Sequence, residues 1–161
     1  ADVSMRRVAT SLSVAPGALY WHISNKQELI ASMAEEIVQV LFDGPLPDPA
    51  RLSRELREAL LSTRDGAEVV VAAVSQPGSQ VQKELETRFA ASVKAWLGEA
   101  ASISNVRIAA RGLLRLTLGD AAVQQSAAQL AQATGAHAES DGAGEHAAAV
   151  AFLLDGLKRS V

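Results

Sequence analysis

Apolar residues recur every three or four positions along most of the chain, which is the spacing of one face of an α-helix. The clearest example is the series Leu52, Leu56 and Leu60. The valine run at 69–71 is also compatible with a strand, but no partner strand is found. The pattern therefore predicts an all-α fold. Helices are predicted over residues 4–12, 16–21, 24–41, 52–60, 67–74, 81–97, 105–131 and 145–159.

Capping residues are found at the starts of several of these helices. Pro16 suits the first position of a helix, where its missing N–H has no intrahelical partner. Ser24 and Gln27 have the spacing of a capping box, which predicts that a helix opens there. Ser104 is predicted to cap the long helix that follows it.

Proline and glycine divide the chain into two predicted domains. Three prolines lie between residues 45 and 49, and they predict a boundary between domains 1–44 and 45–161. Residues 134–144 are rich in alanine, glycine and acidic residues, which is typical of a mobile linker.

Composition excludes several classes of protein. With 48% hydrophobic residues the chain is not a disordered tail, and no apolar run is long enough for a membrane helix. The absence of cysteine excludes disulfides, thiol catalysis and thiolate-bound metal. No export signal is recognisable either, so a cytoplasmic protein with no membrane partner is expected.

Charge is segregated along the chain. The net charge of −3 argues against a nucleic-acid partner when the chain is averaged. Residues 4–27, however, contain three basic and no acidic residues, which leaves 12 basic and 18 acidic residues elsewhere. The same basic stretch predicts two short helices joined by a tight turn. This is the arrangement of a helix-turn-helix, in which the second helix enters the major groove of DNA.

Residues 4–29, SMRRVATSLSVAPGALYWHISNKQEL, resemble the DNA-binding domain of TetR-family transcriptional repressors. The run at 19–22, followed by Asn25, Lys26 and Leu29, is similar to the tetracycline-repressor branch in particular. Weaker similarities follow at 64–67, 116–119, 151–153 and 156–157.

The resemblance implies a helix-turn-helix head followed by a helical body that binds a ligand and dimerises. The chain differs from the family in two respects. The family's helix before Ser4 is missing, so truncation or disorder at the N-terminus is expected. Ser13 also stands where the family usually has a glycine, which suits a left-handed helix cap better.

The predicted DNA contacts follow from the resemblance and from side-chain chemistry. In the family, the tyrosine that corresponds to Tyr20 contacts a backbone phosphate through its hydroxyl. His22 and Lys26 are expected to bind phosphates too, and Ser4 to place a helix N-terminus against one. Arg6 is the best candidate for a base edge, because arginine pairs with two acceptors of guanine. The predicted DNA-binding residues are Ser4, Arg6, Arg7, Pro16, Gly17, Ala18, Tyr20, Trp21, His22 and Lys26.

Each of these residues also has an alternative role. Tyr20 is also compatible with the core, and Ser4 with helix capping alone. His22 and Lys26 are also compatible with plain solvent exposure. Arg6 is also compatible with a solvated or phosphate-bound side chain, and Arg7 is expected at the surface or on a phosphate. The residues at 16–18 offer close approach and apolar contact with thymine methyl groups but few hydrogen bonds. Sequence discrimination is therefore expected to depend on Arg6, close fit and DNA shape.

The body is expected to dimerise, because one short recognition helix reads few base pairs and a palindromic operator requires two heads. The helices at 105–131 and 145–159 are predicted to form a four-helix interface with their copies. Small residues allow the close approach of helices, although packing within one chain is the alternative. These residues are Ala109, Ala110, Gly112, Ala121, Ala122 and Gly156.

A small-molecule effector is expected in the body. Val70 stands where tetracycline repressors carry a metal-binding histidine, which argues against tetracycline itself. Arg111 and Arg115 lie four residues apart and are predicted to meet an acidic or carbonyl group, with surface salt bridges as the alternative. Six further residues are predicted to form the apolar lining of the ligand pocket, and packing in the core is the alternative role for them. The predicted lining residues are Val70, Phe89, Val93, Trp96, Leu114 and Leu118.

A second functional class is a helical metal- or small-molecule-binding protein, or an enzyme, without a role on DNA. Five possible metal ligands lie between residues 137 and 146, mostly in the predicted linker, where a solvated acidic loop is the alternative. They are His137, Glu139, Asp141, Glu145 and His146. No nucleophile–base pair or phosphate-binding glycine loop is recognisable. The sequence therefore predicts a ligand-responsive repressor rather than an enzyme, with no metal or cofactor.

Overall fold

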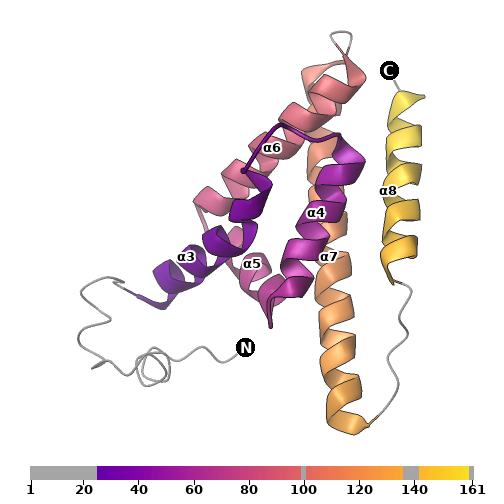
Figure 1. The fold of residues 1–161 in the computed structure, drawn as a ribbon. Helices are drawn as coiled ribbons and strands as arrows, with labels where there is room; N and C mark the ends of the chain where they lie inside the picture. Colours follow the sequence, from indigo (N-terminus) through magenta and orange to yellow (C-terminus); the bar gives the residue numbers. More distant parts are fainter. Residues whose placement is uncertain (1–24, 99–100, 136–141, 160–161) are drawn as a thin grey trace.

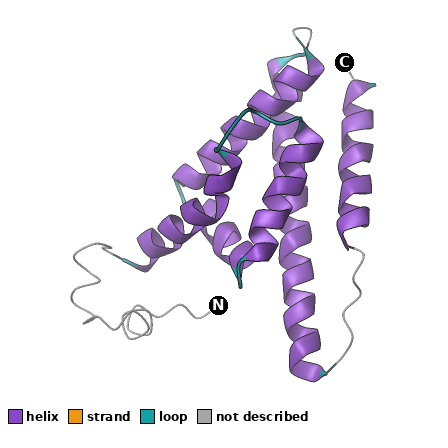
Figure 2. Cartoon of the chain, viewed as in Figure 1, coloured by secondary structure: helices purple, strands orange, loops and turns teal. Residues whose placement is uncertain are grey.

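The computed structural model describes residues 25–98, 101–135 and 142–159. These residues form six α-helices and one 3₁₀ turn, with no strand among them, so the predicted all-α fold is confirmed (Figures 1 and 2). The predicted helices at 4–12 and 16–21 lie outside the described residues. The elements are α3 (Lys26–Val38), η1 (Gln39–Leu41), α4 (Pro49–Ser62), α5 (Gly66–Val74), α6 (Gln80–Leu97), α7 (Ile103–Thr134) and α8 (Gly142–Lys158).

The long helix α7 runs through the middle of the molecule, and α4, α5, α6 and α8 all pack against it. Helix α3 packs mainly against α5, on the side away from α8 (Figure 1). Apolar residues from all six described α-helices form one continuous core. Leu52, Leu56 and Leu60 of α4 are fully buried there, together with Leu85 and Phe89 of α6.

The helix starts are set by side chains that accept backbone N–H groups. The Asn25 side chain accepts from the Glu28 N–H at 2.9 Å, so Asn25 is the cap of α3, one residue after the predicted Ser24. Ser102 caps α7 by accepting from the Asn105 N–H at 3.1 Å, which corrects the prediction of Ser104. The helix cap falls where the backbone is extended, and Asn25 and Ser102 both have that conformation.

Two predicted helix boundaries also need correction. Helix α7 spans 103–134 rather than 105–131, and it ends where Gly135 adopts a left-handed conformation with φ of 69°. Glycine reaches that conformation without a steric penalty, which makes it a common helix stop. Helix α8 begins at Gly142 rather than at residue 145, so only part of the predicted linker remains between the two helices. The valines at 69–71 lie in helix α5, not in a strand.

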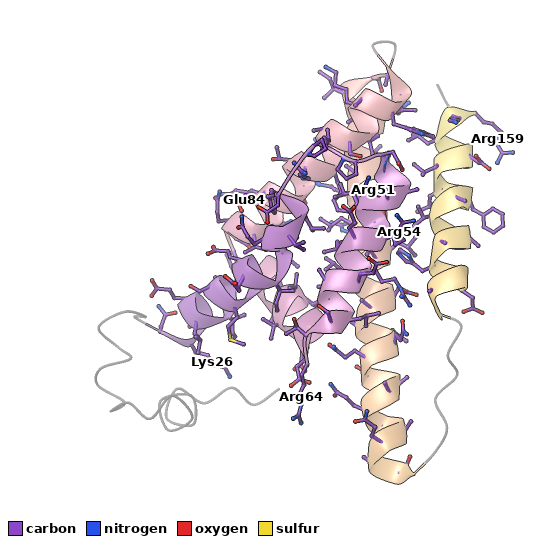
Figure 3. The ribbon with its side chains drawn as sticks, viewed as in Figure 1. Lys26, Arg51, Arg54, Arg64, Glu84 and Arg159 are labelled. Carbon is purple, nitrogen blue, oxygen red and sulfur yellow. The ribbon has the colours of Figure 1, made fainter. Side chains whose placement is uncertain are left out.

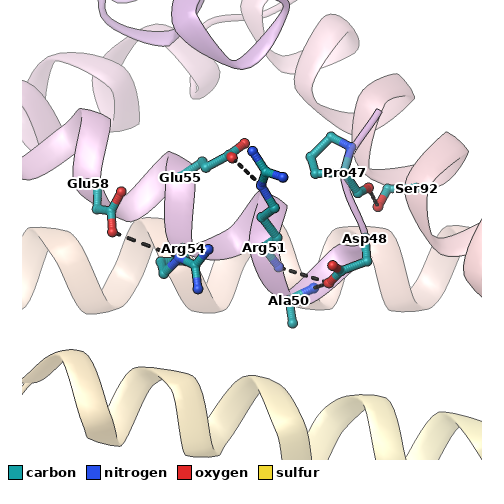
Figure 4. Close-up of polar contacts among 8 residues, drawn as sticks. All are labelled: Pro47, Asp48, Ala50, Arg51, Arg54, Glu55, Glu58 and Ser92. Carbon is teal, nitrogen blue, oxygen red and sulfur yellow. Dashed lines mark hydrogen bonds and ion pairs between the residues drawn. The ribbon is translucent and has the colours of Figure 1, made fainter. Parts of the chain in front are cut away.

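The proline-rich segment at 45–49 connects η1 to α4 and is held at Pro47 and Asp48. Asp48 accepts from the Ala50 and Arg51 N–H groups, each at 3.0 Å, and Pro49 occupies the first turn of α4 (Figure 4). The Ser92 hydroxyl of α6 donates to the Pro47 carbonyl at 2.7 Å. The segment is therefore fixed to α6 as well as to α4. The division into domains 1–44 and 45–161 stays a prediction.

The Asp48 cap is expected to stabilise the start of α4. Asp48→Ala removes the acceptor for two helix N–H groups and is expected to lower the free energy of unfolding by about 1 kcal/mol in a urea titration. Asp43→Ala, at an exposed aspartate that caps no helix, is the matched control and should change stability by less than about 0.5 kcal/mol. Equal losses in the two variants would contradict the capping role.

Candidate functional site

Lys26 is the one predicted DNA-binding residue that the described ranges include. It is the exposed first residue of α3, beside the Asn25 cap, and it lies at the end of α3 that the N-terminal segment joins (Figure 3). Its contact with a phosphate stays a prediction. The other nine residues, from Ser4 to His22, lie outside the described residues, and their roles stay predictions.

The start of α3 is tied to the body through α5. Helix α3 packs against α5, and the Gln76 side chain after α5 donates to the Gln27 carbonyl at 3.3 Å. At the other end of α5, Gln125 of α7 donates to the Thr63 carbonyl and accepts from the Ala67 N–H, both at 3.0 Å. Helix α5 therefore connects α7 with the first turn of α3.

Five of the predicted lining residues lie in the core. Val70, Phe89 and Val93 are fully buried, and Leu114 and Leu118 are nearly so. The sixth, Trp96, is half-buried and carries the Lys158 ammonium 4.4 Å from the centre of its ring. These positions are as expected for the alternative, plain core packing, and a role in ligand binding stays a prediction for all six.

Arg111 and Arg115 of α7 are both exposed at the surface. Arg111 forms an ion pair there. The Arg111 guanidinium donates to Glu86 of α6 at 2.9 and 3.1 Å. Partial burial raises the pKa of Glu86, but hydrogen bonds from Arg111 and Gln82 and the charges of both arginines hold that pKa below its ordinary value. Arg111 thus makes the surface salt bridge that was the alternative to a ligand contact.

A buried polar cluster joins α4, α7 and α8, and the sequence patterns did not single it out. The Arg57 side chain is buried and donates from Nε to Asp120 at 2.7 Å, and it also donates to Gln124. A guanidinium in such a place requires a counter-charge, which Asp120 supplies. The available signal was weak: Arg57 directly follows Leu56 of the buried stripe.

His146 extends this cluster from α8. Its Nε2 lies 3.1 Å from the Thr117 hydroxyl, which itself donates to the Leu113 carbonyl at 2.9 Å. Since the hydroxyl hydrogen is already used, the Thr117 oxygen accepts and Nε2 carries the proton. Burial lowers the pKa of His146; the charge of Asp120 raises it and that of Arg57 lowers it further. His146 is therefore a neutral core residue.

Of the five possible metal ligands between residues 137 and 146, the structure describes two, Glu145 and His146. His146 is buried, whereas its neighbour Glu145 is exposed at the first turn of α8. Among the described residues no group of three metal-binding side chains comes together. The remaining candidates, His137, Glu139 and Asp141, lie outside the described ranges.

Comparison with known proteins extends the resemblance seen at residues 4–29. The profile described as "Bacterial regulatory proteins, tetR family" matches residues 1–33. The crystal structure of Mycobacterium smegmatis BioQ superposes with a TM-score of 0.81 at 36% identity, over 98% of this chain and 87% of that one. The chain belongs to the TetR family. Its all-α body is thus that of a TetR-family regulator.

Two further proteins are similar to this TetR-family chain. A structure of BioQ with its natural double-stranded DNA operator is 32% identical, with a TM-score of 0.73 over 98% of this chain and 87% of that one. The class E tetracycline repressor protein of Escherichia coli is 30% identical over 94 residues, which is 53% of this chain. That match spans 44% of the repressor, so the chain matches less than half of this curated relative. No described helix is long and apolar enough to cross a membrane.

The buried position of His146 predicts a pH dependence of stability. Its pKa in the folded chain is below its ordinary value of 6.5, so the unfolded chain takes up the proton first as the pH falls. The free energy of unfolding should therefore be highest above pH 6.5 and should fall as the pH drops below that value. Urea titrations at pH 7.5 and 5.5 measure the difference.

His146→Gln keeps a side-chain donor for Thr117 and should make this difference smaller. Glu145→Gln, at the exposed residue next to His146, is the matched control and should leave the pH difference unchanged. An unchanged pH dependence in His146→Gln would show that the buried imidazole does not cause it.

Proposed function

We propose that the chain is a transcriptional repressor that binds a palindromic operator as a homodimer and releases it when a small molecule binds to the body. The observation that carries this proposal is the family match at residues 1–33, which coincides with the basic segment at 4–27. The operator complex of the similar protein BioQ supports the choice of double-stranded DNA as partner. In this proposal the chain is a regulator rather than an enzyme.

Recognition of DNA is assigned to the N-terminal segment. Lys26, at the exposed start of α3, and the predicted phosphate-binding residues Tyr20 and His22 would position the head on the backbone. Arg6 would read a base edge. With only three positive charges in residues 4–27, one head is expected to bind weakly, so affinity depends on pairing two heads.

DNA binding is tested by fluorescence anisotropy with the full natural protein and a duplex from upstream of its own gene. Affinity should fall steeply with salt, because bound cations displace counterions from the phosphates. Lys26→Gln should weaken binding to all sequences and, because a homodimer carries two copies of Lys26, reduce the slope of log affinity against log salt by about two. Lys94→Gln, at an exposed lysine of α6, is the control and should leave the slope unchanged. Salt-independent binding, or none, would refute the proposed function.

Dimerisation is assigned to one face of α7 and α8. Ile108, Val123 and Leu130 of α7 are exposed by 65, 72 and 66%. Phe152 and Leu153 of α8 are exposed by 76 and 46%. So much exposed apolar surface is typical of an interface.

The small residues predicted at this interface divide into two groups. Ala110 and Ala121 are buried within the chain, as the alternative of intrachain packing expected. Ala109, Gly112, Ala122 and Gly156 remain partly exposed. Ala109, Gly112 and Gly156, with Ile108 and Phe152, line a cleft of about 430 Å³ between the two helices. A copy of the same face related by a two-fold axis would fit its apolar side chains against these glycines.

Phe152→Glu tests the interface. Each copy would then bury a glutamate carboxylate against the apolar face of its partner, which costs several kcal/mol, so the dimer dissociation constant should rise by about 100-fold or more. Sedimentation velocity over a range of concentrations measures the change. Val40→Glu, at a position exposed by 60% away from α7 and α8, is the matched control and should remain dimeric. A Phe152→Glu protein that dimerises as tightly as the parent would place the interface elsewhere.

A further inference from the structure

A cleft of about 410 Å³ lies between α6 and the segment that follows η1. Its walls come from Phe42 and Leu46 on one side and from α6 on the other. The α6 side supplies Gln80, Lys83, Glu84, Thr87, Arg88 and Ala91. Its volume is within the range that holds a small organic molecule. We infer that this cleft binds a small amphipathic acid, with Arg88 on the anionic group and Phe42 and Leu46 on the apolar body.

Arg88 is the group that points to an anion. Its Nε is buried and has no hydrogen-bond partner among the described residues, and its guanidinium forms no ion pair with them. By contrast, Arg57 and Arg111 each hold a carboxylate at 2.7 and 2.9 Å. A buried donor without a partner is uncommon and costly, so an incoming carboxylate would recover an interaction that the free protein lacks.

The surroundings of Arg88 hold its guanidinium in place and make the cleft favour an anionic ligand. The guanidinium lies over the Phe42 ring, 5.6 Å from the centroid, which limits its movement. Lys83 adds a second cation on the exposed side of the cleft and forms no ion pair among the described residues. The one carboxylate in the lining, Glu84, accepts a hydrogen bond from Gln80 at 2.9 Å (Glu84 is labelled in Figure 3). The cleft thus offers two cations against one acid.

The cleft on the other side of Arg88 has the opposite character. Its lining includes Asp43, Glu55 and Glu58, whose three carboxylates outnumber its two arginines, Arg51 and Arg88. Arg51 is already paired with Glu55 at 2.7 Å (Figure 4). An acidic ligand is therefore directed to the α6 side, where Leu46 is exposed and Phe42 is half-buried. An apolar chain beside a carboxylate matches this combination.

Binding at this cleft would link the end of α3 to α6. Phe42 directly follows η1 and α3, whereas Pro47 in the same segment is held by Ser92 of α6 at 2.7 Å. A ligand between Phe42 and Arg88 would add a second attachment and change how α3 leaves the body. This consequence for DNA rests on the proposed function, whereas binding in the cleft does not.

Isothermal calorimetry with decanoate as the probe tests the inference on the full natural protein, below the concentration at which the probe forms micelles. Decanoate should bind, and decanol, the neutral molecule of equal chain length, should bind at least about 10-fold more weakly. Arg88→Gln should weaken decanoate by about 10- to 100-fold, since a hydrogen bond to a charged group contributes about 1.5–3 kcal/mol. Arg54→Gln, at an exposed arginine outside the cleft, is the matched control and should leave binding unchanged.

Lys83→Gln is the second variant; it alters an exposed side chain and keeps the fold, and it should weaken decanoate by about two- to five-fold. The inference is overturned if decanoate does not bind, if decanol binds equally well, or if Arg88→Gln and Lys83→Gln bind decanoate as the parent does. DNA binding is measured on the same preparation. Loss of DNA binding with intact decanoate binding would refute the proposed function but not the cleft.

Discussion

Burial of α7 is the constraint on which the rest of the structure depends. At about 1.5 Å per residue, its 32 residues extend for about 48 Å, so it reaches beyond each helix packed on it. One side of it is covered by α4, α5 and α6, where Leu113, Leu114 and Leu118 enter the core. The opposite side keeps its apolar residues exposed beside α8. The same helix therefore serves as the centre of the fold and as the proposed interface.

The polar contacts of α7 determine how the neighbouring helices are set against it. Asp120 holds Arg57 of α4 at 2.7 Å, and Thr117 holds His146 of α8 at 3.1 Å. Further along, Gln129 donates to Asp65 at 2.6 Å, where the backbone is left-handed with φ of 58°. These contacts are directional, unlike apolar packing, so they fix the register of α4, α5 and α8 along α7. Because α5 in turn holds the first turn of α3, a shift of α7 would reach the start of α3, which the predicted DNA-binding segment joins.

Periodic apolar residues made the fold predictable, whereas the site depends on contacts between distant positions. The stripe of Leu52, Leu56 and Leu60 is sufficient to place α4 against the core. Nothing near Arg57 in the sequence indicates that Asp120, 63 residues away, is its partner. The same holds for Arg88, whose missing partner is visible only in three dimensions. Helix ends were predicted to within a few residues, because possible caps such as Ser102 and Ser104 lie close together in the sequence and only the backbone conformation identifies the cap.

Charge shows best what the structure adds to the sequence. The net charge of −3 conceals a head with three cations and a body with an acidic excess. Within the body, Arg51, Arg54, Arg57 and Arg111 each lie beside a carboxylate, so their charges are largely cancelled locally and add little to the field felt by DNA. The body as a whole is still acidic, so the proposed function assigns the attraction to DNA to the cations of residues 4–27. In that proposal a second head doubles this number, so operator binding depends on the exposed face of α7 and α8 as well as on the head.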